Sequence, residues 1–69
     1  MITADDARAL VGKRVVLALE PASGEREAAG LCVGKIESLD GLVLVLEPDA
    51  LPGSRRTYHY QHVTAARVL

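Results

Sequence analysis

Two histidines and both aromatic residues of the chain fall in the stretch YHYQH, from Tyr58 to His62. Imidazole can bind a metal ion or act as a general base, and a tyrosine ring can stack on a nucleic-acid base. Arg55 and Arg56 directly precede the stretch and could hold a phosphate group. The alternatives are therefore a metal or catalytic site, a base-stacking surface, or a strand that pairs and packs.

The pattern around this stretch favours a strand over residues 57–61, with side chains alternating between its two faces. Tyr58 and Tyr60 then share one face, and His59 lies on the other. His59 and His62 are expected to point to opposite sides of the extended segment, and no acidic residue neighbours them. We therefore expect no metal site here, unless the chain turns between the two histidines.

The remaining nucleophiles lack the sequence context that activates them. No serine lies in a Gly-x-Ser-x-Gly motif. Cys32 is the only cysteine, so the chain can form neither an intramolecular disulfide nor a cysteine cluster. Its apolar neighbours predict a buried, inert thiol. We expect no enzymatic activity, no catalytic residues, no cofactor and no bound metal.

The composition indicates one small folded domain over residues 1–69, with an aliphatic core because Trp and Phe are absent. Net charge is −1, without the basic excess that is typical of non-specific nucleic-acid binders. The sequence has neither a signal-peptide pattern nor an apolar run near 18 residues, which predicts a cytoplasmic protein without a membrane partner. The composition also resembles that of short proteins from high-GC bacteria and their phages.

The N-terminus predicts one short helix over residues 4–11. Thr3 can cap this helix, and Asp6 follows three residues later, as in a capping box. Gly12 supplies a stop signal at the other end. One apolar stripe with helical spacing is formed by Ala7, Leu10 and Val11.

After the helix the apolar period changes to two. Gly30 and Gly34 fall inside a predicted strand and indicate a bulge or sharp bend. Asp40-Gly41 predicts a hairpin, and the LVLVL run after it is apolar on both faces and needs cover on both sides. Antiparallel strands are expected over residues 13–20, 28–38, 42–47, 57–61 and 65–69.

This order of elements resembles the Sm-like family of small bent β-barrels. VGKRVVLALE is similar to the family's first strand, LDGLVLVLEPDA to its third strand and following loop, and HVTAARVL to its closing pair of strands. Gly30 and Gly34 match the glycines around which its second strand bends. The resemblance implies a mainly β fold, in which a short N-terminal α-helix precedes a strongly bent, five-stranded antiparallel barrel. Src-homology-type barrels have a similar order.

The family's RNA-reading motifs are an Asp-x-x-x-Asn stretch and an Arg-Gly pair, where this chain has ESLDG and HVTA. Small barrels of related types bind peptides and proteins, so we expect a binding module, an adaptor or regulator acting by protein–protein interaction. One alternative is an oligomeric Sm-like RNA-binding protein, and another is a structural assembly subunit. The candidate macromolecule-binding residues are Arg55, Arg56, Tyr58, His59 and Tyr60.

A homo-oligomer is favoured over a monomer. The strand over residues 42–47 is apolar on both faces, and the last strand leaves an edge free. A core without Phe or Trp is small for a chain of 69 residues, and oligomerisation is a common remedy at this size.

Overall fold

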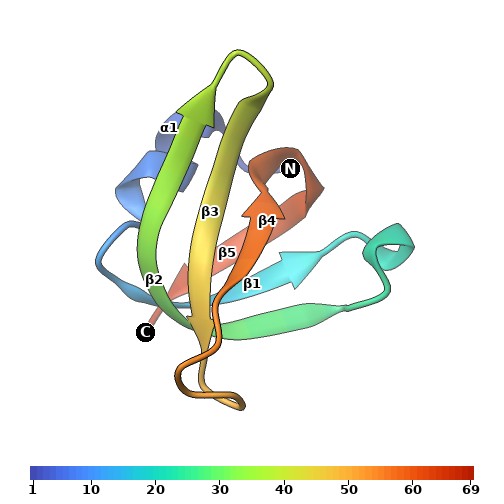
Figure 1. Cartoon of the computed structure of the whole chain (residues 1–69). Coiled ribbons are helices and arrows are strands. Elements are labelled where there is room, and N and C mark those ends of the chain that lie inside the picture. The colour runs from blue at the N-terminus through green and yellow to red at the C-terminus, as the bar shows by residue number, and fades with distance from the viewer.

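The computed structural model of the protein describes residues 1–69, except for the side chain of Ser23. One short helix is followed by five strands, and two 3₁₀ turns, η1 and η2, lie between strands (Figure 1). The strands form one antiparallel sheet in the order β4-β3-β2-β1-β5, which confirms the mainly β class. The elements are α1 (Ala4–Ala9), β1 (Arg14–Leu19), η1 (Pro21–Ser23), β2 (Glu27–Ser38), β3 (Gly41–Pro48), β4 (Arg56–His59), η2 (Tyr60–His62) and β5 (Val63–Val68).

The predicted capping box begins α1. The backbone N–H of Asp6 donates to Thr3 Oγ1 at 3.0 Å, and Asp6 Oδ2 accepts from the backbone N–H of Thr3 at 3.3 Å. These bonds satisfy two of the amide groups that a helix start leaves without partners.

The helix ends at Ala9, two residues before the predicted end. Gly12 has a φ of +85° and donates its N–H to the carbonyl of Cys32 at 2.7 Å, which turns the chain into β1. Ala7 and Leu10 of the predicted apolar stripe are buried, but Val11 is 36% exposed, because it lies in this turn. Val11 was therefore wrongly placed on the buried face.

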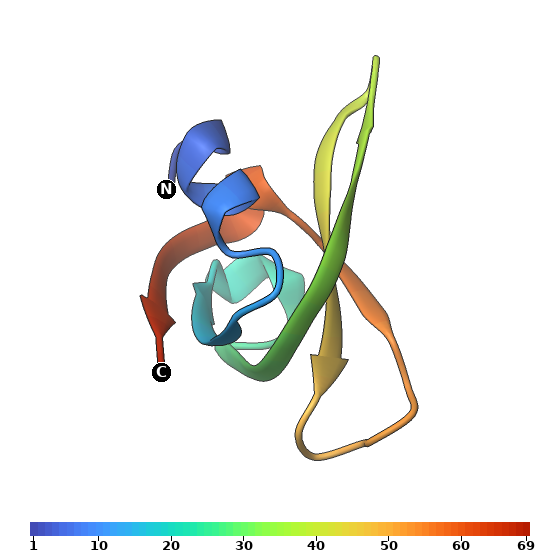
Figure 2. The ribbon, with the colours of Figure 1, turned by 90° about the vertical axis from the view of Figure 1, so that its left-hand side faces the viewer.

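The bend in β2 lies where it was predicted. The register between β2 and β3 shifts between Cys32 and Gly34, as at a β-bulge. The first half of β2 pairs with β1, and the second half pairs with β3. In Figure 2 the β2–β3 hairpin and β4 form one layer, and α1, β1 and β5 lie together on one side of that layer.

The hairpin predicted at Asp40-Gly41 is present. Its two turn residues are Leu39 and Asp40, and Ser38 pairs with Gly41 at the first position of β3. The φ of +127° at Gly41 favours glycine, and a Cβ there would lie 2.6 Å from Nε2 of His59.

The core lies on the inner face of the bent sheet, under the helix. Val15, Leu17 and Leu19 of β1 alternate into it, as the period of two predicted. In β3 the inward residues are Leu42, Leu44 and Leu46. The other buried core residues are Ala7, Leu10, Ala28, Cys32 and Val63.

The sheet does not close into a full barrel, because β4 and β5 are its two edges. Strand β4 ends at His59 instead of the predicted residue 61, and the chain then turns through η2. Nδ1 of His59 accepts from the backbone N–H of Gln61 at 3.4 Å, which stabilises this turn. Strand β5 therefore starts at Val63, earlier than the predicted residue 65, and pairs with β1.

The outer face of β3 has no helix over it. Val43 and Val45 point to this face and are only half-buried. Ile36 of β2 pairs with Val43 of β3, and Ile36 is 54% exposed. None of the helices in the described part of the chain is long and apolar enough to cross a membrane.

Candidate binding site

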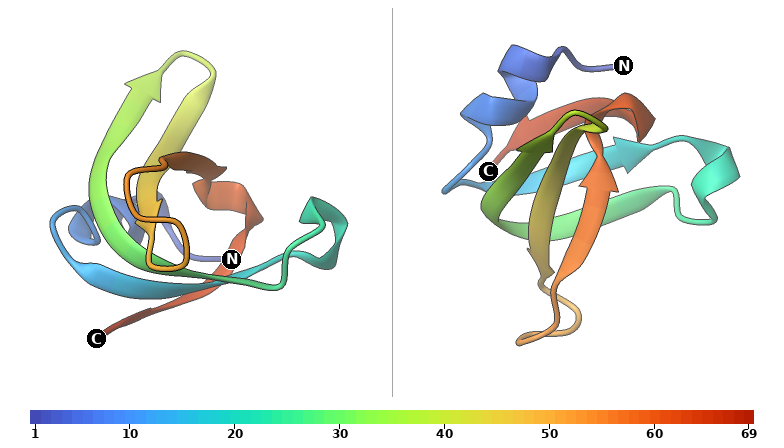
Figure 3. Two further views of the ribbon diagram at one scale, coloured as in Figure 1. Left: turned by 60° about the horizontal axis from the view of Figure 1, so that its bottom comes forward. Right: turned by 45° about the horizontal axis from the view of Figure 1, so that its top comes forward.

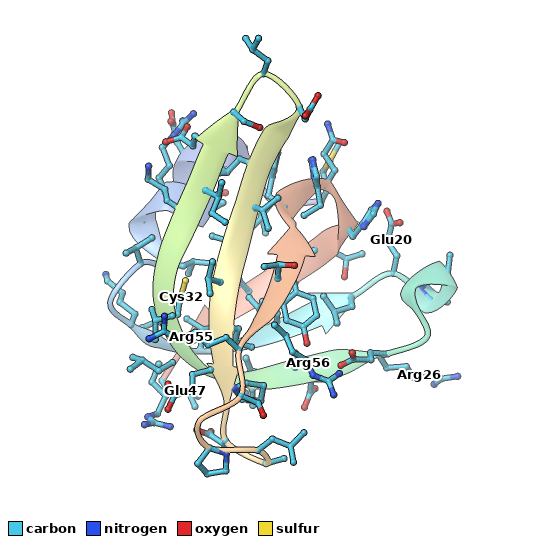
Figure 4. All side chains as sticks on the ribbon, viewed as in Figure 1. Glu20, Arg26, Cys32, Glu47, Arg55 and Arg56 are labelled. Atoms are coloured by element: carbon cyan, nitrogen blue, oxygen red, sulfur yellow. The ribbon has the colours of Figure 1, made fainter. Side chains whose placement is uncertain are left out.

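The five candidate residues do not lie on one surface. Strand β4 alternates, so that Arg56 and Tyr58 pair with the inward-facing residues of β3, whereas His59 pairs with outward-facing Val43. Arg55 precedes the strand, and its side chain extends in the opposite direction from that of Arg56 (Figure 4).

Arg56 and Tyr58 are both joined to Glu25, which lies before β2. Arg56 Nη1 lies 2.9 Å from Glu25 Oε1, and the Tyr58 hydroxyl donates to Glu25 Oε2 at 3.3 Å. Burial, and then the negative charge of Glu25, raise the pKa of the Tyr58 phenol. A phosphate bound at Arg56 would have to replace the Glu25 carboxylate.

The turn at η2 brings together rings that the sequence prediction separated. The ring centroids of His59 and His62 are 5.8 Å apart, and those of His59 and Tyr60 are 5.6 Å apart in a stacked arrangement. The expectation of opposite sides was wrong, because it assumed a strand through residue 61. No group of three or more His, Cys, Asp or Glu in the described part of the chain could hold a metal ion.

Tyr58 also lines a hollow of about 320 Å³. This hollow, called here the β2–β4 hollow, opens between the start of β2, the β3–β4 loop and β4. It is lined by Glu25, Glu27, Ala28, Ala29, Pro48, Asp49, Ala50, Leu51, Arg56 and Tyr58. Most of these residues were not among the sequence candidates. The one feature of the sequence that could have indicated this hollow was the acidic loop before β2. Its distance from Tyr58 depends on the bend of the sheet, which the sequence alone does not fix.

The rim of the β2–β4 hollow is acidic. Glu25, Glu27 and Asp49 contribute three negative charges and Arg56 one positive charge, so the lining has a net charge of −2 (1 − 3). Arg14, which does not line the hollow, pairs with Asp49. Within the described residues the Glu27 side chain forms no hydrogen bond or ion pair, and it is exposed. The site is therefore suited to a cationic group.

The thiol of Cys32 is 1% exposed, which confirms that it is buried. Burial raises its pKa, although Sγ also donates to the carbonyl of Gly34 at 3.6 Å. A thiol with a raised pKa and no access to solvent is a poor nucleophile.

These features define a small, mainly β structure with an open five-stranded sheet and, among the described residues, an acidic hollow. Comparison with protein-family models, with curated proteins and with solved structures finds no match to this chain. The function is therefore inferred from the geometry of the hollow and its surroundings.

Proposed function

We propose that the protein is a non-enzymatic, small-barrel binding module, an adaptor or regulator that binds a partner protein at the β2–β4 hollow. One observation carries the proposal: a half-buried tyrosine, aliphatic side chains and carboxylates line a single open hollow. Tyrosine is enriched at protein interfaces because it combines a large apolar ring with a polar edge. The bent five-stranded antiparallel sheet is also compatible with a small β-barrel, the fold class that the resemblance implies.

The charges favour a protein over a nucleic acid. An RNA-binding site using Arg55, Arg56, Tyr58 and Tyr60 would need these side chains on one surface. Arg55 and Arg56 instead lie on opposite sides, and Arg56 is paired with Glu25. The acidic rim would also repel a phosphate backbone.

The binding module is proposed to act as a homo-oligomer. The outer face of β3 and the two sheet edges support this assembly, since each leaves apolar side chains or backbone groups uncovered by the rest of the chain. A cytoplasmic location remains the prediction made from the sequence.

Affinity capture from the native host with a variant that fills the hollow tests the proposal. Ala50 is exposed and lines the hollow, so Ala50→Trp should obstruct it without disturbing the core. Ala9 is an exposed alanine on α1, outside the hollow, and Ala9→Trp is the matched control. Wild type and Ala9→Trp are expected to retain a protein partner that Ala50→Trp loses, with no change after nuclease treatment.

Equal recovery of the partner on Ala50→Trp would contradict binding at this hollow. Recovery of nucleic acid, with capture abolished by ribonuclease, would favour the RNA-binding alternative. Melting curves of both variants should match wild type, so that a loss of capture reports the site and not the fold.

A further inference from the structure

We propose that the β2–β4 hollow recognises a lysine or arginine side chain carried by an extended segment of the partner protein. The inference rests on the proposed function, because it names the chemistry of the partner at the same site. Three features of the hollow carry it: its charge, its apolar lining and the free strand edge beside it.

The negative charge of the rim favours a cationic ligand that forms contacts absent from the free protein. Glu25 already interacts with Arg56 and Tyr58, and Asp49 with Arg14. Glu27 lies on the same rim and is exposed, with its side chain available to a ligand. A charged donor that reaches Glu27 would form a charge-assisted hydrogen bond and reduce the negative charge of the rim.

The apolar lining suits the stem of a long basic side chain. The methylene groups of lysine and arginine pack on apolar surface while the charged end stays at the polar rim. Ala28, Pro48 and Leu51 supply such a surface, and the ring of Tyr58 forms part of the same wall. A short side chain would not cover the apolar wall, and an acidic side chain would be repelled by the negative charge of the rim.

The start of β2 also presents a free strand edge to the hollow. β3 pairs with β2 only from Gly30 onward, and the last contact is the N–H of Asp49 donating to the carbonyl of Ala29 at 3.0 Å. Backbone groups two residues apart on a strand point to the same side, so those of Glu27 point to the same side as the carbonyl of Ala29. Figure 3 shows that the arm formed by β1, η1 and the start of β2 extends away from the hairpin.

An extended peptide can add its backbone to such an edge. The peptide would then run alongside Glu27, and one of its side chains would enter the hollow. This geometry explains why the proposed ligand is a segment of a protein and not a free amine.

Selection of a random peptide library displayed on phage, against the full-length protein, tests the inference. The Kd is then measured for a synthetic copy of the most enriched peptide and for its counterpart with the basic residue replaced by norleucine. We expect enriched peptides to share a lysine or arginine beside aliphatic residues. Norleucine should weaken binding by about two- to fivefold, as should Glu27→Lys, because an exposed ion pair contributes at most about 1 kcal/mol. Asp40→Lys changes the charge equally but lies at the hairpin turn, and it should leave the Kd unchanged.

Enriched peptides without a basic residue, blocked by Ala50→Trp but not by Glu27→Lys, would overturn this inference and leave the proposed function intact. Peptides whose binding is unaffected by Ala50→Trp would overturn both. A selection that enriches no peptide would overturn the inference, while the capture experiment would still decide the proposed function.

Discussion

Gly30 and Gly34 both lie in the bent part of β2, but only Gly30 is closely packed. A Cβ on Gly30 would lie 2.1 Å from the carbonyl oxygen of Glu47, whereas a Cβ on Gly34 would meet nothing within 4 Å. The close approach at Gly30 involves backbone atoms, which cannot move aside as a flexible side chain can. Of the two glycines that indicated the bend, Gly30 is therefore the one that the packing requires.

Gly30→Ala is expected to destabilise the protein by about 3 kcal/mol or to prevent folding, because β3 must move away from β2. Gly34→Ala is the matched control and should change the free energy of unfolding by less than about 1 kcal/mol. Urea unfolding followed by circular dichroism measures both. Equal effects of the two substitutions would contradict this account of the bend.

At the scale of elements, α1 is tied to β2 through Arg8 and Glu37. Arg8 Nε and Nη2 donate to Glu37 Oε1 at 2.9 and 2.8 Å, and Lys35 also contacts Glu37. The hydrogen bonds from Arg8, and then those from Lys35, lower the pKa of Glu37 from 4.5 to about 2. The Glu37 carboxylate is therefore favoured in the folded state.

This lowered pKa predicts the sign of a pH dependence. A carboxyl group whose pKa is depressed on folding stabilises the protein above its unfolded pKa, and this contribution is lost as the pH falls through the folded pKa. The contribution of Glu37 should therefore be present above pH 4.5 and disappear as the pH approaches about 2. Glu37→Gln should unfold more easily than wild type near neutral pH and converge with it at low pH.

Acid unfolding curves of Glu37→Gln, wild type and Asp40→Asn measure this difference. Asp40 lies in the hairpin turn, and Asp40→Asn controls for the loss of one exposed carboxylate. Parallel curves for wild type and Glu37→Gln across the whole range would show that the contact does not couple α1 to the sheet.

The η2 turn changes the reason for expecting no metal, but it does not change the prediction. Two imidazoles at this spacing supply only half of a tetrahedral ligand set, and Nδ1 of His59 accepts from the backbone of Gln61. Zinc or nickel should therefore leave the Tm unchanged, since a ligand specific to the folded state would raise it. A rise with metal that His59→Ala abolishes would show a two-histidine site.

At the scale of the whole molecule, the open sheet leaves the outer face of β3 uncovered. Val43→Asp and Val45→Asp should each dissociate the proposed homo-oligomer, because a buried carboxylate at an apolar interface is strongly disfavoured. Both residues are half-buried in the single chain, so the monomer should still fold. Val11→Asp is the control at an exposed valine away from β3.

Light scattering at micromolar concentration measures the assembly. A wild-type mass above that of one chain, reduced in both β3 variants and retained in Val11→Asp, is the expected result. A wild-type mass of one chain that does not change on tenfold dilution would exclude the homo-oligomer.

The sequence by itself determined the elements whose signals are local. The capping box of α1, the period of two in β1 and the hairpin at Asp40-Gly41 each depend on residues close together in the chain. The same holds for the burial of Cys32, which follows from its apolar neighbours. These predictions therefore required no knowledge of how the elements pack.

Only the tertiary structure decided where the candidate side chains meet. Arg56 and Glu25 are 31 residues apart, and no local pattern pairs them. The turn at η2, the contact between the histidine rings and the β2–β4 hollow likewise depend on how the bent sheet packs against itself. Alternation along a strand fixes which face a side chain takes, but the path of the whole chain fixes what lies opposite it.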